Sequence, residues 1–243
     1  MLRIASYNIC KSVGPDLRRR PERILAVLAE IAADVVALQE ADRRFGDRAS
    51  TLPIEALEAE AGYRAVAFDR RPASLGWRGN ALLVRPGIDV RAARALALPS
   101  LEPRGAVIAD ISAQGLSLRV ACMHLGLTGA FRRRQARAVL QAATEGGEGP
   151  LVMMGDFNEW SALGGAVALL AHGRRVSPPM PSFHAAAPVA PLDRIVTSPD
   201  LAMLRFHVHA SPAARRASDH LPVWADIAPA AVAAGAPSSG AAP

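Results

Sequence analysis

Apolar residues fall into short runs separated by turn residues, and their spacing alternates between strand-like and helical along the chain. After Pro21, a residue type that favours the first helical position, Ile24, Val27, Leu28 and Ile31 would share one helix face. We therefore expect helices from Pro21 and over 54–61, 130–143 and 161–171. The remaining apolar runs predict strands over 2–9, 35–38, 63–68, 80–85, 106–112, 116–123, 151–154, 193–197, 202–209 and 221–227.

Several of these strands, between residues 63 and 123, follow one another with no helix between them, which favours antiparallel pairing. The helices before and after them must then cover the outer faces of the sheets. The pattern predicts an α/β fold of two packed, mixed and mainly antiparallel sheets flanked by helices, in one domain over 1–228. The Ala-, Pro-, Gly- and Ser-rich segment 229–243 lacks residues that could form a core, and we expect a disordered tail.

Composition narrows the class of protein. Half of the 243 residues (51%) are apolar, enough for one large core, yet no uncharged apolar run approaches the roughly 20 residues of a membrane span. The first residues read as a strand rather than as a secretory leader. The two cysteines, Cys10 and Cys122, suit a reducing compartment, so we expect a cytoplasmic protein.

The chain carries a net charge of +6, and Lys11 is its only lysine. This balance fits an anionic substrate or partner, but it fits a compositional bias towards arginine equally well. Arg18 to Arg20 follow the first strand and could clamp a polyanion, whereas Arg132 to Arg134 and Arg137 are expected to form a solvated helix face. Trp77 is the best candidate for stacking on a nucleic-acid base.

Polar residues stand at one end of six predicted strands. The segments that carry them are Ser6-Tyr7-Asn8, Leu38-Gln39-Glu40, His124-Leu125, Gly155-Asp156-Phe157-Asn158, Leu192-Asp193 and Ser218-Asp219-His220. Taken singly, each has a structural interpretation: Asn8 as a turn residue, Glu40 as a helix-start carboxylate, and Asp156 and Asn158 as an Asx turn or a cap of helix 161–171. Together, on strands lying side by side, they would form a site for a hard metal ion and an anion.

The ordered segments SYN, LQE, HL, GDFN, LDRI and SDH resemble the endonuclease/exonuclease/phosphatase superfamily, over about residues 3–227. The resemblance implies a four-layer α/β sandwich of the DNase I type. It also implies metal-dependent hydrolysis of phosphate esters, as in phosphodiesterases, nucleases and phosphatases.

The resemblance assigns a role to each strand-end residue. Glu40 and Asn8 would hold Mg²⁺, with Mn²⁺ as the alternative ion, and Asp219 would be a further ligand or would orient its neighbours. Among the expected catalytic residues, His220 would contact the scissile phosphate and Asp193 would orient His220. Asp156 would act on the attacking water or on the leaving oxygen. Asn158 and His124 would contact phosphoryl oxygens. Many nucleases of the family have Asp where this chain has Cys10, so a second acidic metal ligand there is in doubt.

The substrate is left open by the sequence. Asn80 and Arg104 resemble family positions that approach the substrate, although Asn80 could equally be a turn residue. A nucleic acid, a phospholipid headgroup and a small phosphate ester all remain candidates, and one alternative is a DNA-repair nuclease. A non-catalytic binding module would be expected to have lost Glu40, Asp156 or His220. The motifs do not involve His172, His207 or His209, which we assign to surface or packing positions.

Overall fold

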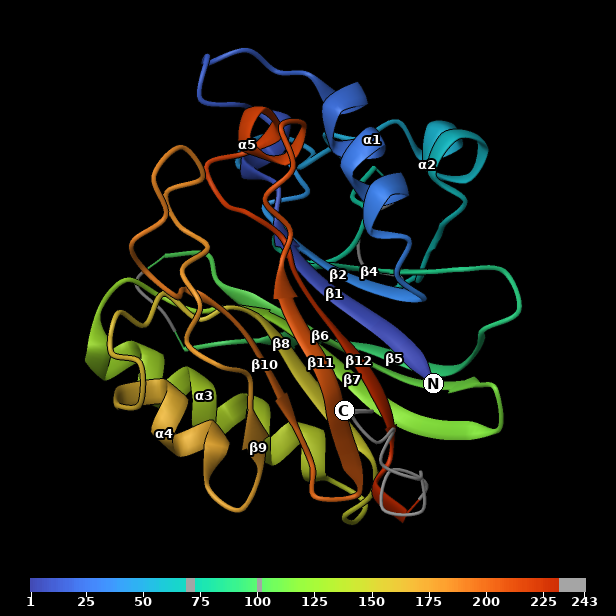
Figure 1. Cartoon of the computed structure of the whole chain (residues 1–243), viewed down its shortest axis with the longest axis vertical. Coiled ribbons are helices and arrows are strands. Elements are labelled where there is room, and N and C mark those ends of the chain that lie inside the picture. Colours follow the sequence, from blue (N-terminus) through green and yellow to red (C-terminus); the bar gives the residue numbers. More distant parts are fainter. Residues whose placement is uncertain (69–72, 100–101, 232–243) are drawn as a thin grey trace, which may run out of the picture.

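Two six-stranded sheets form the centre of the protein. We describe residues 1–68, 73–99 and 102–231 of a computed structural model (Figure 1). The first sheet contains β1 (Leu2–Asn8), β2 (Val35–Gln39), β3 (Arg64–Ala65), β4 (Ala81–Val84), β11 (Leu201–Val208) and β12 (Val223–Pro229), in the order β11-β12-β1-β2-β4-β3. The second contains β5 (Asp89–Ala97), β6 (Gly105–Ala113), β7 (Leu116–His124), β8 (Leu151–Asp156), β9 (Arg175–Val176) and β10 (Asp193–Thr197), in the order β5-β6-β7-β8-β10-β9.

Helices cover the outer faces of both sheets. On the first sheet lie α1 (Pro21–Ile31), α2 (Ile54–Ala61) and the short α5 (Ala214–Ala217), and on the second lie α3 (Gly129–Thr144) and α4 (Gly165–Ala171) (Figure 1). Pairing is antiparallel except between β1 and β2 and between β7 and β8. The predicted four-layer α/β sandwich with mixed, mainly antiparallel sheets is therefore confirmed.

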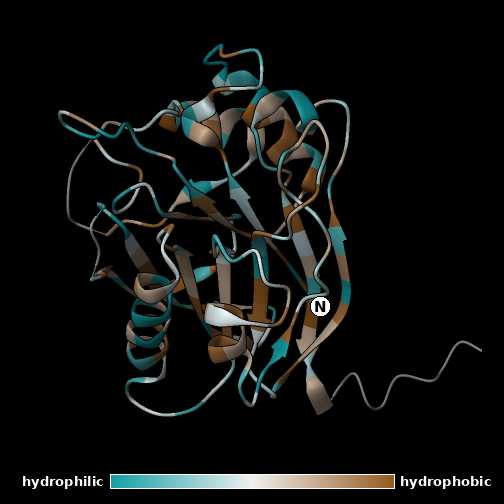
Figure 2. Ribbon diagram, turned by 90° about the vertical axis from the view of Figure 1, so that its left-hand side faces the viewer, coloured by the Kyte–Doolittle hydropathy of each residue, from teal (hydrophilic) through white to brown (hydrophobic). Residues whose placement is uncertain are grey.

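The core follows from how the apolar positions alternate. Ile24, Val27, Leu28 and Ile31 are buried on α1, as their helical spacing predicts. In β8, Met154 belongs to the core between the sheets, whereas Met153 belongs to the core under α3 and α4, because successive strand residues point to opposite faces. Figure 2 shows hydrophobic stretches along the strands of both sheets.

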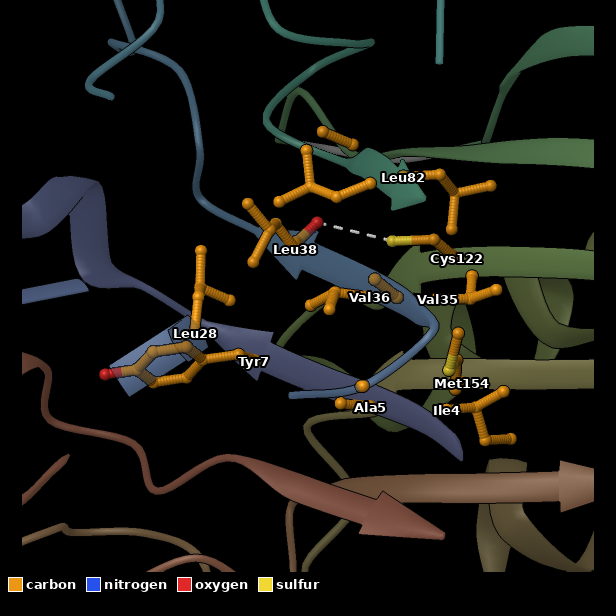
Figure 3. Close-up of a cluster of buried hydrophobic side chains, with 14 of the residues drawn as sticks. Ile4, Ala5, Tyr7, Leu28, Val35, Val36, Leu38, Leu82, Cys122 and Met154 are labelled. Atoms are coloured by element: carbon orange, nitrogen blue, oxygen red, sulfur yellow. Dashed lines mark hydrogen bonds between the residues drawn. The ribbon is translucent and has the colours of Figure 1, made fainter. Parts of the chain in front are cut away.

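Buried apolar side chains of both sheets form one core between them. Figure 3 shows Cys122 and Met154 of the second sheet close to side chains of the first, among them Ile4, Val36 and Leu38. The Cys122 thiol donates to the carbonyl of Leu38 at 3.3 Å, and burial raises the pKa of this thiol to about 12. Cys122 is therefore a packed, protonated core residue.

Several details differ from the sequence predictions, among them the start of one helix and the presence of short or exposed elements. The helix predicted over 161–171 begins only at Gly165, because the Ser161 hydroxyl accepts the N–H of Gly164 at 2.9 Å and holds a turn before it. Strand β5 was not predicted, since most of its residues are exposed at the edge of the sheet and show no alternation. The strands and helices also include β9, η1 (Cys10–Ser12) and α5, which are too short to produce a periodic pattern.

The C-terminal end of the described chain continues the first sheet. β12 runs to Pro229, and the N–H of Ala230 donates to the carbonyl of Asp200 at 2.8 Å. Residues 232–243 of the predicted tail lie outside the described residues. Among the helices of the described ranges, none has the length and apolarity to span a bilayer.

Candidate active site

The polar strand ends of the two sheets meet at one edge of the sandwich. In the first sheet Asn8 pairs in register with Gln39, immediately before Glu40. In the second sheet His124 and Asp193 both lie in register with Asp156, on β7 and β10 at either side of β8. The side chain of Asn8 bridges the sheets, because its amide donates to Asp156 Oδ2 at 3.0 Å.

Asp156 lies at the centre of this edge, with only 1% of its surface exposed. Its Oδ1 accepts the backbone N–H of Asn158 at 2.8 Å, so the Asx turn considered from the sequence is present. The other interpretation, a cap of the following helix, is wrong, because α4 begins after Gly164. Burial raises the pKa of Asp156 to about 6, while the charge of His220 acts in the opposite direction.

Asn158 turns away from the strand with a backbone φ of 49°, a conformation that Asn tolerates better than most residues. Its side-chain amide donates to the carbonyl of Leu125 at 2.9 Å. Since an amide nitrogen carries two hydrogens, one remains available to a ligand oxygen. The turn therefore fixes Asn158 beside Asp156.

His220 is held between two carboxylates. Its Nδ1 lies 2.8 Å from Asp193 Oδ2, which also accepts the hydroxyl of Ser182 at 2.6 Å. Its Nε2 lies 3.7 Å from Asp156 Oδ2. Burial alone would lower the pKa of His220, but the charges of Asp193 and Asp156 outweigh it and raise the pKa to about 10. At neutral pH His220 is therefore an imidazolium whose Nε2–H faces Asp156.

His124 has the opposite protonation state. Burial, together with the charges of Arg104 and His220, lowers the pKa of this imidazole well below its usual range. Its Nε2 lies 2.5 Å from a guanidinium nitrogen of Arg104 and 3.3 Å from Asp156 Oδ2. Because an arginine nitrogen can only donate, neutral His124 must present the lone pair of Nε2 to Arg104.

Arg104 itself is anchored by Glu102 at 2.9 Å. The structure thus brings Arg104 to the expected edge, next to His124. Asn80 is fully buried, and its amide donates to the carbonyl of Gly105 at 2.9 Å, while its backbone pairs with Trp77 in a tight turn. These contacts agree with the interpretation of Asn80 as a turn residue.

Glu40 follows β2 and reaches the cleft at this edge, with 26% of its side chain exposed. No helix follows it before α2, so it is not a helix-start carboxylate. The Lys11 ammonium, carried by η1, forms an ion pair with Glu40 Oε2. No motif in the sequence identifies Lys11 as a residue of the site.

The donor atoms near Glu40 suit a hard cation. Glu40 offers carboxylate oxygens, and Asn8 Oδ1 offers an amide oxygen that also accepts the N–H of Cys10 at 3.1 Å. The described residues contain no cluster of three His, Cys, Asp or Glu side chains that could enclose a metal ion. A bound ion would therefore take most of its ligands from water and substrate, as Mg²⁺ commonly does and structural Zn²⁺ does not.

Ser218, which was not predicted as a site residue, connects the remaining motif residues. Its hydroxyl donates to the carbonyl of Asn8 at 2.7 Å and accepts the N–H of His220 at 3.3 Å. Asp219 follows it and lies beside the Cys10 thiol, whose pKa rises to about 11 through burial and this carboxylate. Cys10 thus has an acidic neighbour in Asp219.

A cleft opens beside Glu40 and His124, and arginines line much of it. Its basic lining residues are Lys11, Arg43, Arg44, Arg48, Arg78 and Arg104. Arg18 to Arg20 are exposed and are not among the described lining residues, so the polyanion clamp expected there has no counterpart in this cleft. Nothing in the pattern of loop 41–50 distinguished its arginines from solvated ones.

Arg132 corrects another expectation. Its side chain is only 12% exposed, pairs with Glu159 at 3.3 Å and donates to the carbonyl of Leu127 at 2.6 Å. Arg133, Arg134 and Arg137 are exposed, as expected of a solvated face. His209 pairs with Glu30 at 2.7 Å and His207 lies against Trp224, which agrees with their assignment to surface and packing positions.

Comparison with known proteins identifies relatives for nearly the whole chain. Residues 5–220 match the model of the Endonuclease/Exonuclease/phosphatase family. The chain is 30% identical over 171 residues to the uncharacterized protein YbhP of Escherichia coli K12. This alignment covers 63% of each protein, so the chain spans less than two thirds of that relative.

Solved structures share the fold at low sequence identity. Mannosyl-6-phosphatase Bt3783 of Bacteroides thetaiotaomicron has a TM-score of 0.74 and 17% identity, over 94% of this chain and 100% of that chain. D. rerio TDP2, in complex with a single strand DNA product, has a TM-score of 0.71 and 19% identity, over 93% and 98%. At these identities the likeness establishes the architecture alone.

Proposed function

The chain belongs to the endonuclease/exonuclease/phosphatase family, and on that premise we propose that it is a divalent-metal-dependent hydrolase of phosphate esters. The observation that carries the proposal is the buried array Asp193–His220–Asp156, in which His220 Nδ1 lies 2.8 Å from Asp193 and Nε2 lies 3.7 Å from Asp156. Buried carboxylates and imidazoles with opposed pKa shifts are typical of catalytic sites.

In this proposal Asp156 and His220 divide the proton chemistry. At neutral pH Asp156, with a pKa of about 6, is mostly ionised and accepts a proton from the attacking water. The His220 imidazolium donates its Nε2–H to a phosphoryl oxygen, and Asp193 keeps that hydrogen pointed into the site. Asn158 and the Arg104–His124 pair would contact the other phosphoryl oxygens, which gain negative charge as the ester bond breaks.

Glu40 and Asn8 would hold the metal ion, for which Mg²⁺ is our first choice and Mn²⁺ the second, and Asp219 would support it. When bound, such an ion supplies positive charge opposite the phosphoryl oxygens. Lys11, now paired with Glu40, would then be released towards the cleft.

The substrate class is a phosphorylated compound. The structural relatives include a mannosyl-6-phosphatase and a protein complexed with single strand DNA product. A nucleic acid and a small or headgroup phosphate ester are therefore both candidate substrates. A DNA-repair role remains the alternative, and a salt-sensitive affinity for duplex DNA would favour it. We keep the cytoplasm as the expected location.

The first experiment measures hydrolysis of bis-p-nitrophenyl phosphate and p-nitrophenyl phosphate with Mg²⁺, with and without EDTA. Glu40→Ala and His220→Ala should each lower kcat by about 10²-fold or more, because one removes the metal carboxylate and the other the imidazolium. His172→Ala, at an exposed histidine, is the matched control and should keep full activity.

Diester cleavage that disappears in EDTA and in both variants supports a phosphodiesterase, and turnover of the monoester alone supports a phosphatase. Activity that persists in Glu40→Ala and His220→Ala would contradict the proposed site.

A further inference from the structure

The arginine-lined cleft beside Glu40 has more positive than negative side chains. Arg43, Arg44 and Arg48 come from the loop between β2 and α2, and Arg78 comes from the turn before β4. These arginines belong to neither of the two arginine clusters of the sequence, Arg18 to Arg20 and the α3 arginines. Their side chains line one concave surface adjoining the proposed catalytic site.

The acidic residues of the cleft already have partners. Glu40 pairs with Lys11, and Glu102 pairs with Arg104 at 2.9 Å. Asp42 is 4% exposed, and its oxygens accept the Ser74 hydroxyl at 2.6 Å and the Leu75 N–H at 2.8 Å. Ion pairs therefore engage two of the six basic side chains, and the charge of Asp42 also acts on Arg48 without forming an ion pair.

Among the described lining residues, four basic side chains of the cleft are left without an ion pair, and three of them come from the loop after β2. Within the described ranges, Arg43, Arg44 and Arg48 form no ion pair and donate no side-chain hydrogen bond. Arg43 and Arg44 are exposed, and Arg48 is half-buried. Several like charges around one concavity repel one another and raise the local concentration of anions, so the arrangement favours a bound polyvalent anion.

The same positive potential extends to the catalytic residues. Lys11, which pairs with Glu40, and Arg104, which contacts His124 at 2.5 Å, line the same cleft as Arg44. Lys11 and Arg104 in turn help to lower the pKa of His124. Arg44, Lys11, Arg104 and His124 therefore line one cleft, which adjoins Asp156 at His124.

We propose that this cleft binds a second phosphate group of the substrate, separate from the phosphate that is cleaved. The inference rests on the proposed function and deepens it: the substrate is a phosphate ester that carries at least one further phosphate. Guanidinium groups match phosphate oxygens through paired N–H donors. Arg43, Arg44 and Arg48, none of which forms an ion pair, fit the ~1.5 to 2 negative charges of a terminal phosphate better than a single carboxylate.

The test compares ligands that differ by one phosphate. Inhibition of bis-p-nitrophenyl phosphate hydrolysis is measured with thymidine 3′,5′-bisphosphate against thymidine 5′-monophosphate, and with inositol 1,4-bisphosphate against inositol 1-phosphate. In the wild type we expect the bisphosphate of at least one pair to inhibit about tenfold more strongly than its monophosphate. The pair with the larger ratio indicates whether the substrate is a nucleotide or a headgroup.

Arg43→Gln/Arg44→Gln/Arg48→Gln should reduce that ratio to near one. The control Arg91→Gln/Arg137→Gln/Arg174→Gln removes the same charge elsewhere: Arg91 and Arg174 lie towards the end of the second sheet opposite Asp156, and Arg137 is exposed on α3. The control should keep both the ratio and the activity. The single variant Arg44→Gln, at an exposed residue, should give an intermediate ratio if the triple variant folds poorly.

Equal inhibition by mono- and bisphosphates in the wild type would overturn the proposal, and so would an equal fall of the ratio in both triple variants. Failure of the proposed function is recognised separately, as absent hydrolysis of bis-p-nitrophenyl phosphate. In that case calorimetric binding of the same four ligands, compared between the wild type and the two triple variants, decides on the subsite alone.

Discussion

At the scale of single residues, Asp193 determines what His220 can do. It accepts the Nδ1–H of His220 at 2.8 Å and is itself fixed by the Ser182 hydroxyl. Although burial opposes it, this carboxylate and Asp156 keep the imidazole protonated. Asp193 is thus a positioning residue, which sets both the orientation and the charge of the group facing the substrate.

We predict that Asp193→Asn lowers the pKa of His220 from about 10 towards the ordinary value of about 6.5. An NMR titration of the imidazole would measure the change, and kcat should fall roughly 10² to 10⁴-fold. Asp193→Glu, which restores the charge, should recover part of the raised pKa. An unchanged His220 pKa in Asp193→Asn would show that the Asp193 carboxylate does not raise the pKa of His220.

The raised pKa of His220 also predicts how stability depends on pH. A group whose pKa is higher in the folded state stabilises it fully below the unfolded value of about 6.5, and this contribution is lost as pH rises towards 10. Urea unfolding of the wild type should therefore show a declining free energy of unfolding over that interval. Asp193→Asn should flatten this part of the profile, and identical slopes in both proteins would contradict the assignment.

The motif residues of the site could be predicted from the sequence, because each stands at the end of an apolar run. The residues that support them could not. Ser182 lies in a loop with no periodic pattern, and Lys11 and Arg44 follow strand ends without any distinguishing neighbour. Their importance depends on which strands become neighbours, and single-sequence patterns do not contain that information.

At the scale of elements, β8 explains why a glycine precedes Asp156. A Cβ on Gly155 would collide with the backbone carbonyl of Met123 on the neighbouring strand β7. Gly155 also has a φ of 154°, which few other residues adopt. The close approach of β7 and β8 aligns His124 with Asp156.

Gly155→Ala is therefore expected to lower the free energy of unfolding by about 1–3 kcal/mol, as overpacking does, and to displace His124 from Asp156. Urea denaturation measures the loss of stability, and a lower kcat on a diester would report the displacement of His124. Gly149→Ala is the matched control, because a Cβ there meets no atom within 4 Å, and its effect should stay within about 0.5 kcal/mol. Equal effects of the two substitutions would rule out the backbone collision as the cause.

Asp226 on β12 links three strands of the first sheet. It is 1% exposed and accepts from Arg3 of β1 at 2.8 Å and from Arg205 of β11. Burial raises the pKa of Asp226, but Arg3 and Arg205 outweigh it, and the pKa lies below its usual range. This stabilisation is present above the unfolded pKa of about 3.9 and is lost as pH falls through the folded pKa.

Asp226→Asn should cost about 1–3 kcal/mol at pH 7, since it weakens a buried charged hydrogen-bond network. Below pH 4 the difference from the wild type should shrink, which unfolding curves at pH 7 and pH 3 would measure. Asp89→Asn, at an exposed carboxylate, is the control. A difference that stays constant with pH would show that the charge of Asp226 is not what stabilises the sheet.

Most elements could be predicted because burial imposes a period on them. The helix from Pro21 and the apolar strands next to the core follow their patterns closely. β5 lies at the edge of the second sheet with mostly exposed residues, so burial imposes no alternation on Asp89–Ala97. The start of α4 was misplaced because the Ser161 turn competes locally with the helix.

At the scale of the whole molecule, each sheet contributes half of the proposed site. Asn8 ends β1 and Glu40 follows β2 of the first sheet, whereas His124, Asp156 and Asp193 belong to the second. The Asn8–Asp156 hydrogen bond at 3.0 Å joins the two halves. The proposed metal ligands Asn8 and Glu40 come together only when β1 and β2 are paired in the folded sheet, so the binding of an ion to them must stabilise the fold.

We therefore predict that Mg²⁺ raises the melting temperature of the wild type and has little effect on Glu40→Gln. At a Mg²⁺ concentration ten times the dissociation constant, the linkage amounts to about 1.4 kcal/mol, enough for a shift of a few degrees. Glu40→Gln keeps the shape of the side chain while removing its charge. The melting temperature of each protein is measured with and without Mg²⁺, and the Mg²⁺-dependent shifts are compared. Glu55→Gln, at an exposed glutamate of α2, should respond like the wild type. An equal Mg²⁺-dependent shift in Glu40→Gln would place the ion elsewhere, because a carboxylate is the strongest ligand that this edge can offer to a hard cation.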